Sequence, residues 1–122
     1  MGYEMKFYVV NKLPTGEDLK YGQIVAMYDY CQDYDLASFI DDNSKDTDTY
    51  IYVNVKETTK DMYGKPLSEI SIDSLLNYLE SHPCNAYRRY WPFVSLLRGF
   101  KEVQDEPDNE TFEDLVVLRY GY

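Results

Sequence analysis

The stretch Tyr50-Ile51-Tyr52-Val53-Asn54-Val55-Lys56 has the clearest β-strand pattern in this chain of 122 residues. β-Branched residues occupy every second position, with aromatic or polar residues between them. Because side chains alternate across a strand, the pattern predicts Ile51, Val53 and Val55 on one face and the tyrosines on the other. An apolar face must be covered, so this strand predicts a sheet packed against a second layer.

Two further strands are predicted towards the ends of the chain. Residues 5–11 form a short apolar segment rich in β-prone side chains. Residues 112–120 contain the continuous run Leu115-Val116-Val117-Leu118, which is typical of a central strand buried on both faces.

The region after the first predicted strand fits a helix. Thr15 and Asp18 resemble a capping box behind a turn, and they predict a helix over residues 17–32. Gly22 weakens this interpretation, and residues 23–30 fit a strand as well.

Three more helical segments are predicted. Asp35 is a suitable N-cap for a short one. Ser71 caps the next, which should stop near His82 because a proline follows. The last is predicted over residues 84–99, with Gly99 as its C-terminal cap.

These elements follow one another in the order β-α-β-α-α-β. We therefore predict a single α+β domain over residues 1–122, with a small sheet of about three strands packed against two to four helices. The length agrees with one domain, since domains commonly have about 100–150 residues.

The charge is strongly acidic and unevenly distributed. The chain has 22 Asp and Glu against 12 Lys and Arg, which gives a net charge of -10. Residues 29–48 and 102–114 together hold most of the acids. The acids that we predict to bind a partner lie in these two blocks: Asp29, Asp33, Asp35, Asp41, Asp42, Asp46 and Asp48 in the first, and Glu102, Asp105, Glu106, Asp108 and Glu110 in the second.

This layout decides which partners are expected. Two acidic blocks would repel phosphates, which argues against direct nucleic-acid binding and against anionic membranes. The attractive partner is a basic protein surface, such as that of a nucleic-acid-binding protein or a nuclease. For a continuous negative surface we expect both blocks on one side of the fold, with Asp29 and Asp33 on adjacent turns of the helix predicted over residues 17–32.

No catalytic, metal or cofactor motif is convincing. An EF-hand loop starting at Asp46 would need Gly where Ile51 stands, so it fails. His82 and Cys84 are separated by one proline, which rarely aligns a nucleophile with its base. The six glycines are scattered and form no phosphate loop. We therefore expect a protein that is not an enzyme and has no cofactor.

One segment has the composition of an interface. Trp, Tyr and Arg are enriched in interface hot spots, and Tyr87, Arg88, Arg89 and Tyr90 precede Trp91. These four residues are candidates for a partner or homodimer contact, with both arginines on the surface. Trp91 itself is predicted to be buried, because it stands before a proline where the chain bends.

The composition resembles that of phage-encoded anti-restriction and anti-CRISPR proteins, as a class and without a specific motif. The first hypothesis is thus a small acidic inhibitor that occupies a basic nucleic-acid-binding surface, as a nucleic-acid mimic does. The alternatives are an immunity protein that neutralises a basic nuclease toxin, and a non-enzymatic adaptor whose acidity serves solubility. With no signal peptide and no apolar run of about 20 residues, the expected location is the cytoplasm, that of the host cell if phage-encoded.

Overall fold

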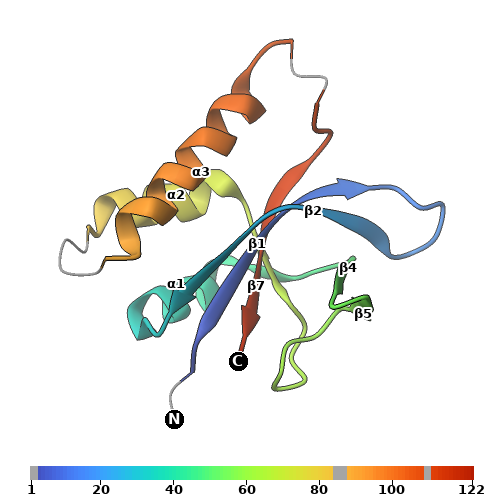
Figure 1. The fold of residues 1–122 in the computed structure, drawn as a ribbon, viewed down its shortest axis with the longest axis horizontal. Coiled ribbons are helices and arrows are strands. Elements are labelled where there is room, and N and C mark those ends of the chain that lie inside the picture. Colours follow the sequence, from blue (N-terminus) through green and yellow to red (C-terminus); the bar gives the residue numbers. More distant parts are fainter. Residues whose placement is uncertain (1–2, 84–87, 109–110) are drawn as a thin grey trace.

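The structure is a computed structural model that describes residues 3–83, 88–108 and 111–122. Within these ranges it contains one curled sheet of seven strands and three helices (Figure 1). The elements are β1 (Met5–Leu13), β2 (Lys20–Cys31), α1 (Tyr34–Asn43), β3 (Lys45–Asp46), β4 (Thr49–Val53), β5 (Lys56–Thr58), β6 (Ser68–Ile70), α2 (Ile72–Ser81), α3 (Tyr90–Asp105) and β7 (Leu115–Gly121). The expected three-stranded sheet was therefore wrong, although the broad α+β class is right.

The strand order forces the sheet to curl. The order is β3-β6-β7-β1-β2-β4-β5, and the neighbours are antiparallel except β2 and β4. In a flat sheet, five strand spacings of about 4.8 Å would put β4 about 24 Å from β3. Only Thr47 and Asp48 join these strands, and this link reaches about 11 Å at most. The sheet therefore bends into a half-barrel.

The helix expected over residues 17–32 is a strand instead. β2 pairs with β1 along almost its whole length, with a register shift opposite Val9 and Val10. Gly22, which weakened the helix prediction, allows β4 to approach β2. A Cβ atom on Gly22 would stand only 2.7 Å from Thr49 Cγ2 and 2.8 Å from Ile51 Cγ2. Tertiary packing and this close approach therefore make the segment a strand rather than a helix.

The strand expected over residues 50–56 is a hairpin. β4 ends at Val53, and the chain reverses through Asn54 and Val55, which have φ angles of 52° and 58°. Ile51 is buried as expected, but Val55 is 99% exposed. A β-branched residue in the left-handed region is strained by about 1–3 kcal/mol, so residue alternation alone did not predict this turn.

Two apolar clusters cover the two faces of the sheet. On β1, Phe7 and Val9 belong to the cluster that the helices cover, whereas Tyr8 and Val10 point into the second cluster. The second cluster contains strand residues and Leu67, so it fills the inside of the curl. The run Leu115-Val116-Val117-Leu118 on β7 contributes to both clusters, which confirms that this strand is central and buried on both faces.

The helices form one layer on the outer face of the sheet (Figure 1). Asp33, rather than Asp35, caps α1 by accepting a hydrogen bond from the Leu36 N–H. Ser71 caps α2 as predicted. Gly99 does not end a helix: α3 continues to Asp105. No helix in the described ranges is long and apolar enough to cross a membrane.

At the start of α3, the prediction that Trp91 is buried is wrong. Trp91 was expected in the core but is 46% exposed, while Tyr90 is buried. The two rings stack with centroids 4.8 Å apart. Tyr90 and not Trp91 thus provides the aromatic packing at this end of the helix.

Candidate functional site

Four of the predicted partner-binding acids lie in the last turn of a helix. Asp41 and Asp42 lie in the last turn of α1, and Glu102 and Asp105 in that of α3. Neither last turn contains a basic residue. A helix C-terminus is the negative end of the helix dipole, so an exposed carboxylate there without an ion pair within the described residues, as at Asp42 and Glu102, opposes folding by about 0.3–1 kcal/mol.

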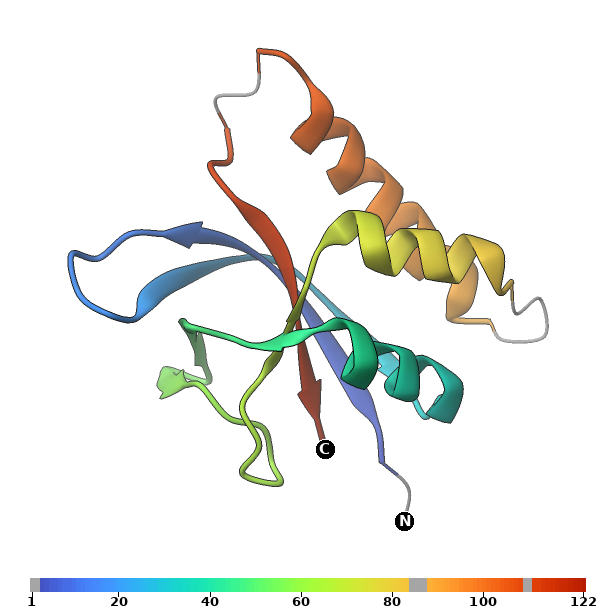
Figure 2. The same ribbon diagram turned by 180° about the vertical axis from the view of Figure 1, so that it is seen from behind.

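These two helix ends lie at the same side of the helix layer. α2 lies between α1 and α3, and both neighbours end where α2 begins (Figure 2). Lys101 of α3 binds both Asp73, in the first turn of α2, at 2.8 Å and Asp105 at 3.0 Å. Asn43 at the end of α1 lines one surface depression with Ser74 of α2. The helix-borne parts of the two acidic blocks are therefore neighbours across α2, without direct contact.

Four acids of the first block have intramolecular partners. Asp29 lies on β2, 3.7 Å from Lys6 Nζ, and Asp33 is the N-cap, so the expected spacing of these two along one helix is wrong. Asp41 pairs with Arg119, and Asp48 with Lys12.

The remaining acids project into solvent. In the described ranges, Asp35, Asp42 and Asp46 are exposed and form no ion pair. The same holds for Glu102, Glu106 and Asp108 of the second block. Glu110 lies outside the described residues. Of the predicted partner-binding acids, these six form no ion pair within the described residues; we call them the free acids.

A buried ionic network closes the half-barrel. Lys12 of β1 donates to Glu69 of β6 at 3.1 Å and lies 2.9 Å from Asp48 Oδ1 in the link between β3 and β4. The side chains of Lys12 and Glu69 are only 4% and 7% exposed. Burial alone would lower the pKa of Lys12, but hydrogen bonds to the two carboxylates raise it above its ordinary value. The network joins three elements that are distant in the sequence, and no sequence pattern indicated it.

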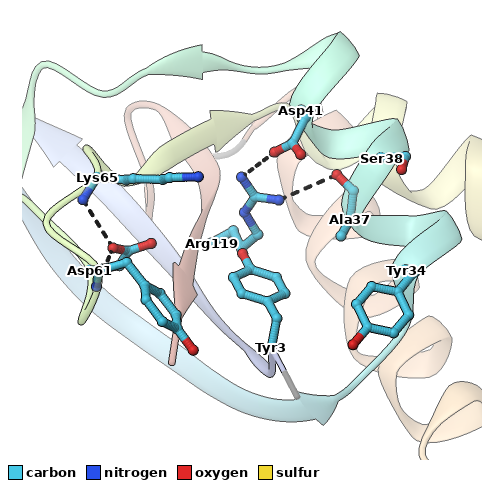
Figure 3. Close-up of a pocket in the computed structure, with 9 residues that line it drawn as sticks. Tyr3, Tyr34, Ala37, Ser38, Asp41, Asp61, Lys65 and Arg119 are labelled. Carbon is cyan, nitrogen blue, oxygen red and sulfur yellow. Dashed lines mark hydrogen bonds and ion pairs between the residues drawn. The ribbon is translucent and has the colours of Figure 1, made fainter. Parts of the chain in front are cut away.

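A pocket of about 430 Å³ lies between α1, the loop at residues 61–65 and the end of β7 (Figure 3). Arg119 lies at its centre. It donates to Asp41 at 2.6 Å, to Ser68 Oγ at 2.7 Å and to the Ala37 carbonyl at 3.3 Å, so it fastens α1 to the sheet. Its guanidinium also lies over the Tyr3 ring, 5.9 Å from the centroid.

The pocket is lined by charges of both signs. Asp41 and Asp61 offset Arg119 and Lys65 in the lining. Burial raises the pKa of the Tyr3 phenol, so this group stays neutral and keeps a proton that it can donate. The pocket therefore contains hydrogen-bonding groups and charges of both signs.

The residues of the candidate interface segment are largely used inside the fold. Arg89 Nη1 donates to the Asp29 carbonyl at 3.0 Å, and the Arg89 carbonyl accepts from the Tyr28 hydroxyl at 2.8 Å. Tyr90 donates to the Leu79 carbonyl. Arg88 is exposed, and Tyr87 lies outside the described residues. This segment mainly attaches α3 to β2 and α2.

A partly exposed tyrosine cluster was not predicted, because its members come from two strands. The rings of Tyr21, Tyr50 and Tyr52 lie 5.6–6.1 Å apart. They belong to the edge of the sheet where β2 pairs with β4. Only the parallel pairing of these strands brings the rings together.

Among the described residues, no group of three or more His, Cys, Asp or Glu side chains could hold a metal ion. Comparison with known protein families, curated proteins and solved structures finds no match to this chain.

Proposed function

We propose that this protein is an acidic inhibitor that binds a basic, nucleic-acid-binding surface of a target protein. One observation supports the proposal: Asp42 and Glu102, which form no ion pair within the described residues, occupy the C-terminal turns of α1 and α3, where a carboxylate opposes the helix dipole, and both turns flank the start of α2. Acids needed only for solubility could stand anywhere on the surface at less cost to stability.

The contact chemistry follows from the free acids. A groove that binds nucleic acid presents Lys and Arg side chains to phosphates, and carboxylates accept the same charge-assisted hydrogen bonds. Asp42 and Glu102 stand on helices that pack against the sheet, so their positions are fixed before binding. A preorganised acidic surface loses less conformational entropy on binding than a flexible acidic tail.

The test begins with capture of a target from the source cells on immobilised protein. The purified target is then loaded with a fluorescent oligonucleotide, and displacement is followed by anisotropy. We expect the wild-type protein to displace the nucleic acid stoichiometrically, and less well at high salt, because exposed charges are screened beyond about 8 Å. Asp42→Asn combined with Glu102→Gln should weaken displacement mainly through a slower association rate.

The matched control removes the same charge elsewhere. Glu17→Gln with Asp18→Asn neutralises two exposed acids in the β1–β2 loop, far from the helix layer (Figure 1). This control should displace the oligonucleotide as the wild type does. If both variants lose displacement equally, the net charge of the protein, and not the position of the acids, determines binding. A target that binds the protein and nucleic acid simultaneously would contradict the inhibitor proposal.

The identity of the target separates the remaining alternatives. A restriction or CRISPR-type enzyme would make the protein a phage-type inhibitor, and a nuclease toxin would make it an immunity protein. Both use the same acidic surface, so the displacement assay applies to either. An adaptor would bind its target without displacing nucleic acid.

A further inference from the structure

The pocket of about 430 Å³ beside α1 is built from parts that are distant in the sequence (Figure 3). The loop at residues 61–65 forms one wall, and Tyr3 and Arg119 lie between this loop and the helix. The volume falls within the range of about 300–1,000 Å³ that is usual for small-molecule sites. The opposite wall is one face of α1, whose residues have the helical spacing i, i+3, i+4 and i+7: Tyr34, Ala37, Ser38 and Asp41.

The loop wall is held in shape by hydrogen bonds of its own. Asp61 Oδ1 accepts from the backbone N–H of Tyr63 at 2.8 Å and from that of Lys65 at 3.1 Å. The Asp61 N–H donates to the Lys65 carbonyl at 2.8 Å, and Gly64 closes the turn with a φ of 76°. The backbone that carries Tyr63 and Lys65 is therefore ordered before a ligand enters, which lowers the entropy cost of binding.

Hydrogen-bonding capacity remains on both sides of the pocket. In the described part of the chain, Arg119 uses three of its five N–H groups. The exposed Lys65 side chain forms no ion pair with any described residue and extends into the pocket (Figure 3). Asp41 and Asp61 each engage only Oδ1 with the described residues. A ligand in this pocket can thus accept hydrogen bonds from cations and donate them to carboxylates.

The charges are paired with one another and do not form a positive end and a negative end. Asp41 lies 2.6 Å from Arg119, and Asp61 and Lys65 share one turn of the loop. An ionised ligand group would therefore meet a charge of its own sign beside each opposite one. A neutral hydroxyl group suits this arrangement better, because it can accept from a lysine or arginine and donate to the neighbouring carboxylate at the same time.

Three tyrosines add apolar surface to the pocket. Tyr34 and Tyr63 are 61% and 54% exposed, so the fold leaves much of each ring uncovered. The ring of Tyr3 lies 5.9 Å from that of Tyr63, measured between centroids. Aromatic side chains give a ligand large apolar contact area, and a few polar groups then fix its orientation. A sugar ring offers both kinds of contact, with C–H groups for the tyrosines and hydroxyl groups for the polar side chains.

We propose that this pocket binds a neutral sugar ring with vicinal hydroxyl groups, either a free saccharide or the ribose of a nucleoside. The hydroxyl groups accept from Lys65 and Arg119 and donate to the unengaged oxygens of the two aspartates. The proposal goes beyond the inhibitor function and does not depend on it. Salt does not screen a neutral ligand, so its affinity should stay constant as salt is raised, whereas binding of a basic target should weaken.

The test is a chemical-shift titration of the nitrogen-15-labelled protein. One arm uses D-glucose, D-galactose and D-mannose, and the other uses adenosine and 2′-deoxyadenosine. We expect a saccharide or adenosine to shift the amide signals of Tyr34, Ala37 and Lys65 with saturation at a single site. Lys65→Met should raise the dissociation constant at least about tenfold, because it removes a charge-assisted hydrogen bond. Lys56→Met, which removes an exposed lysine outside the pocket, should leave the constant unchanged.

The two arms separate the sources of the sugar ring. Adenosine that binds when 2′-deoxyadenosine does not would identify the ribose, and binding of a hexose alone would identify a saccharide.

Three results would overturn the proposal. The first is the absence of shifts in the pocket with every compound up to its solubility limit. The second is an affinity that Lys65→Met and Lys56→Met leave equally unchanged, which would put the site elsewhere. The third is tighter binding of a probe without vicinal hydroxyl groups, namely glycine, inorganic phosphate or 2′-deoxyadenosine, than of any sugar.

Discussion

Glycines show most directly how single residues decide this fold. Gly22 faces the methyl groups of Thr49 and Ile51, whereas a Cβ on Gly99 would have no atom within 4 Å. Gly22→Ala should therefore cost about 1–3 kcal/mol, the usual effect of overpacking a tight contact. Gly99→Ala, in the middle of α3, should stabilise by about 0.5–1 kcal/mol. Urea unfolding of the two variants checks the prediction, and equal signs would contradict it.

Asp48 gives a pH dependence with a definite sign. A hydrogen bond from Lys12 holds the pKa of Asp48 below its ordinary 3.8. A carboxylate with a depressed pKa in the folded state stabilises above its unfolded-state pKa, and this contribution is lost as the pH falls through the folded-state value.

Asp48→Asn should accordingly be less stable than the wild type at neutral pH. The difference in unfolding free energy should shrink as the pH falls below about 3.8. Urea titrations at a series of pH values measure it. A difference that stays constant down to the lowest pH would show that Asp48 contributes through packing rather than charge.

At the scale of elements, the ionic network closes the sheet. Lys12→Met should leave Glu69 buried with only Thr47 and the exposed Lys45 as side-chain partners. Breaking a buried pair typically costs 3–5 kcal/mol, and we expect about 3 kcal/mol because those contacts remain. Lys20→Met is the control: its ion pair with Asp48 is long, at 3.9 Å, and exposed, so its loss should cost less than about 1 kcal/mol. Similar costs for both variants would show that the network does not hold the strands together.

Sequence patterns predicted elements well where one local signal dominated. The Ser71 cap, the end of α2 near His82 and the doubly buried run of β7 were all predicted correctly. The pattern of residues 17–32 fitted both a helix and a strand. The pairing of this segment with β1 makes it a strand. The turn at Asn54 and Val55 was missed because a valine there contradicts local preference. β3, β5 and β6 have only two or three residues each, too few for any period to be visible.

The candidate site was predictable in composition but not in arrangement. Charge counts alone identified the two acidic blocks. Which acids are free depends on partners far away in the sequence, such as Lys12 for Asp48 and Arg119 for Asp41. Tyr90 and Trp91 exchanged their expected roles because the register of α3 against the sheet, and not residue size, decides which ring is buried.

At the scale of the whole molecule, acidic and apolar surfaces are segregated. The helix ends present free acids at one end of the fold, and the β4–β5 hairpin presents the exposed side chains of Tyr52 and Val55 at the other. In both places, side chains stand where they weaken folding: Asp42 and Glu102 at helix C-termini, and the strained, exposed Val55. We propose that these positions serve binding.

The most direct test of this claim is the unfolding free energy of the variant that combines Asp42→Asn with Glu102→Gln. If these acids oppose the helix dipoles, removing both charges should stabilise the protein by about 0.6–2 kcal/mol at low salt, with a smaller gain at high salt. Glu17→Gln with Asp18→Asn, which changes the net charge equally, should gain less. A neutralised variant less stable than the wild type would show that the carboxylates serve the fold, and would remove the observation on which the proposed function depends.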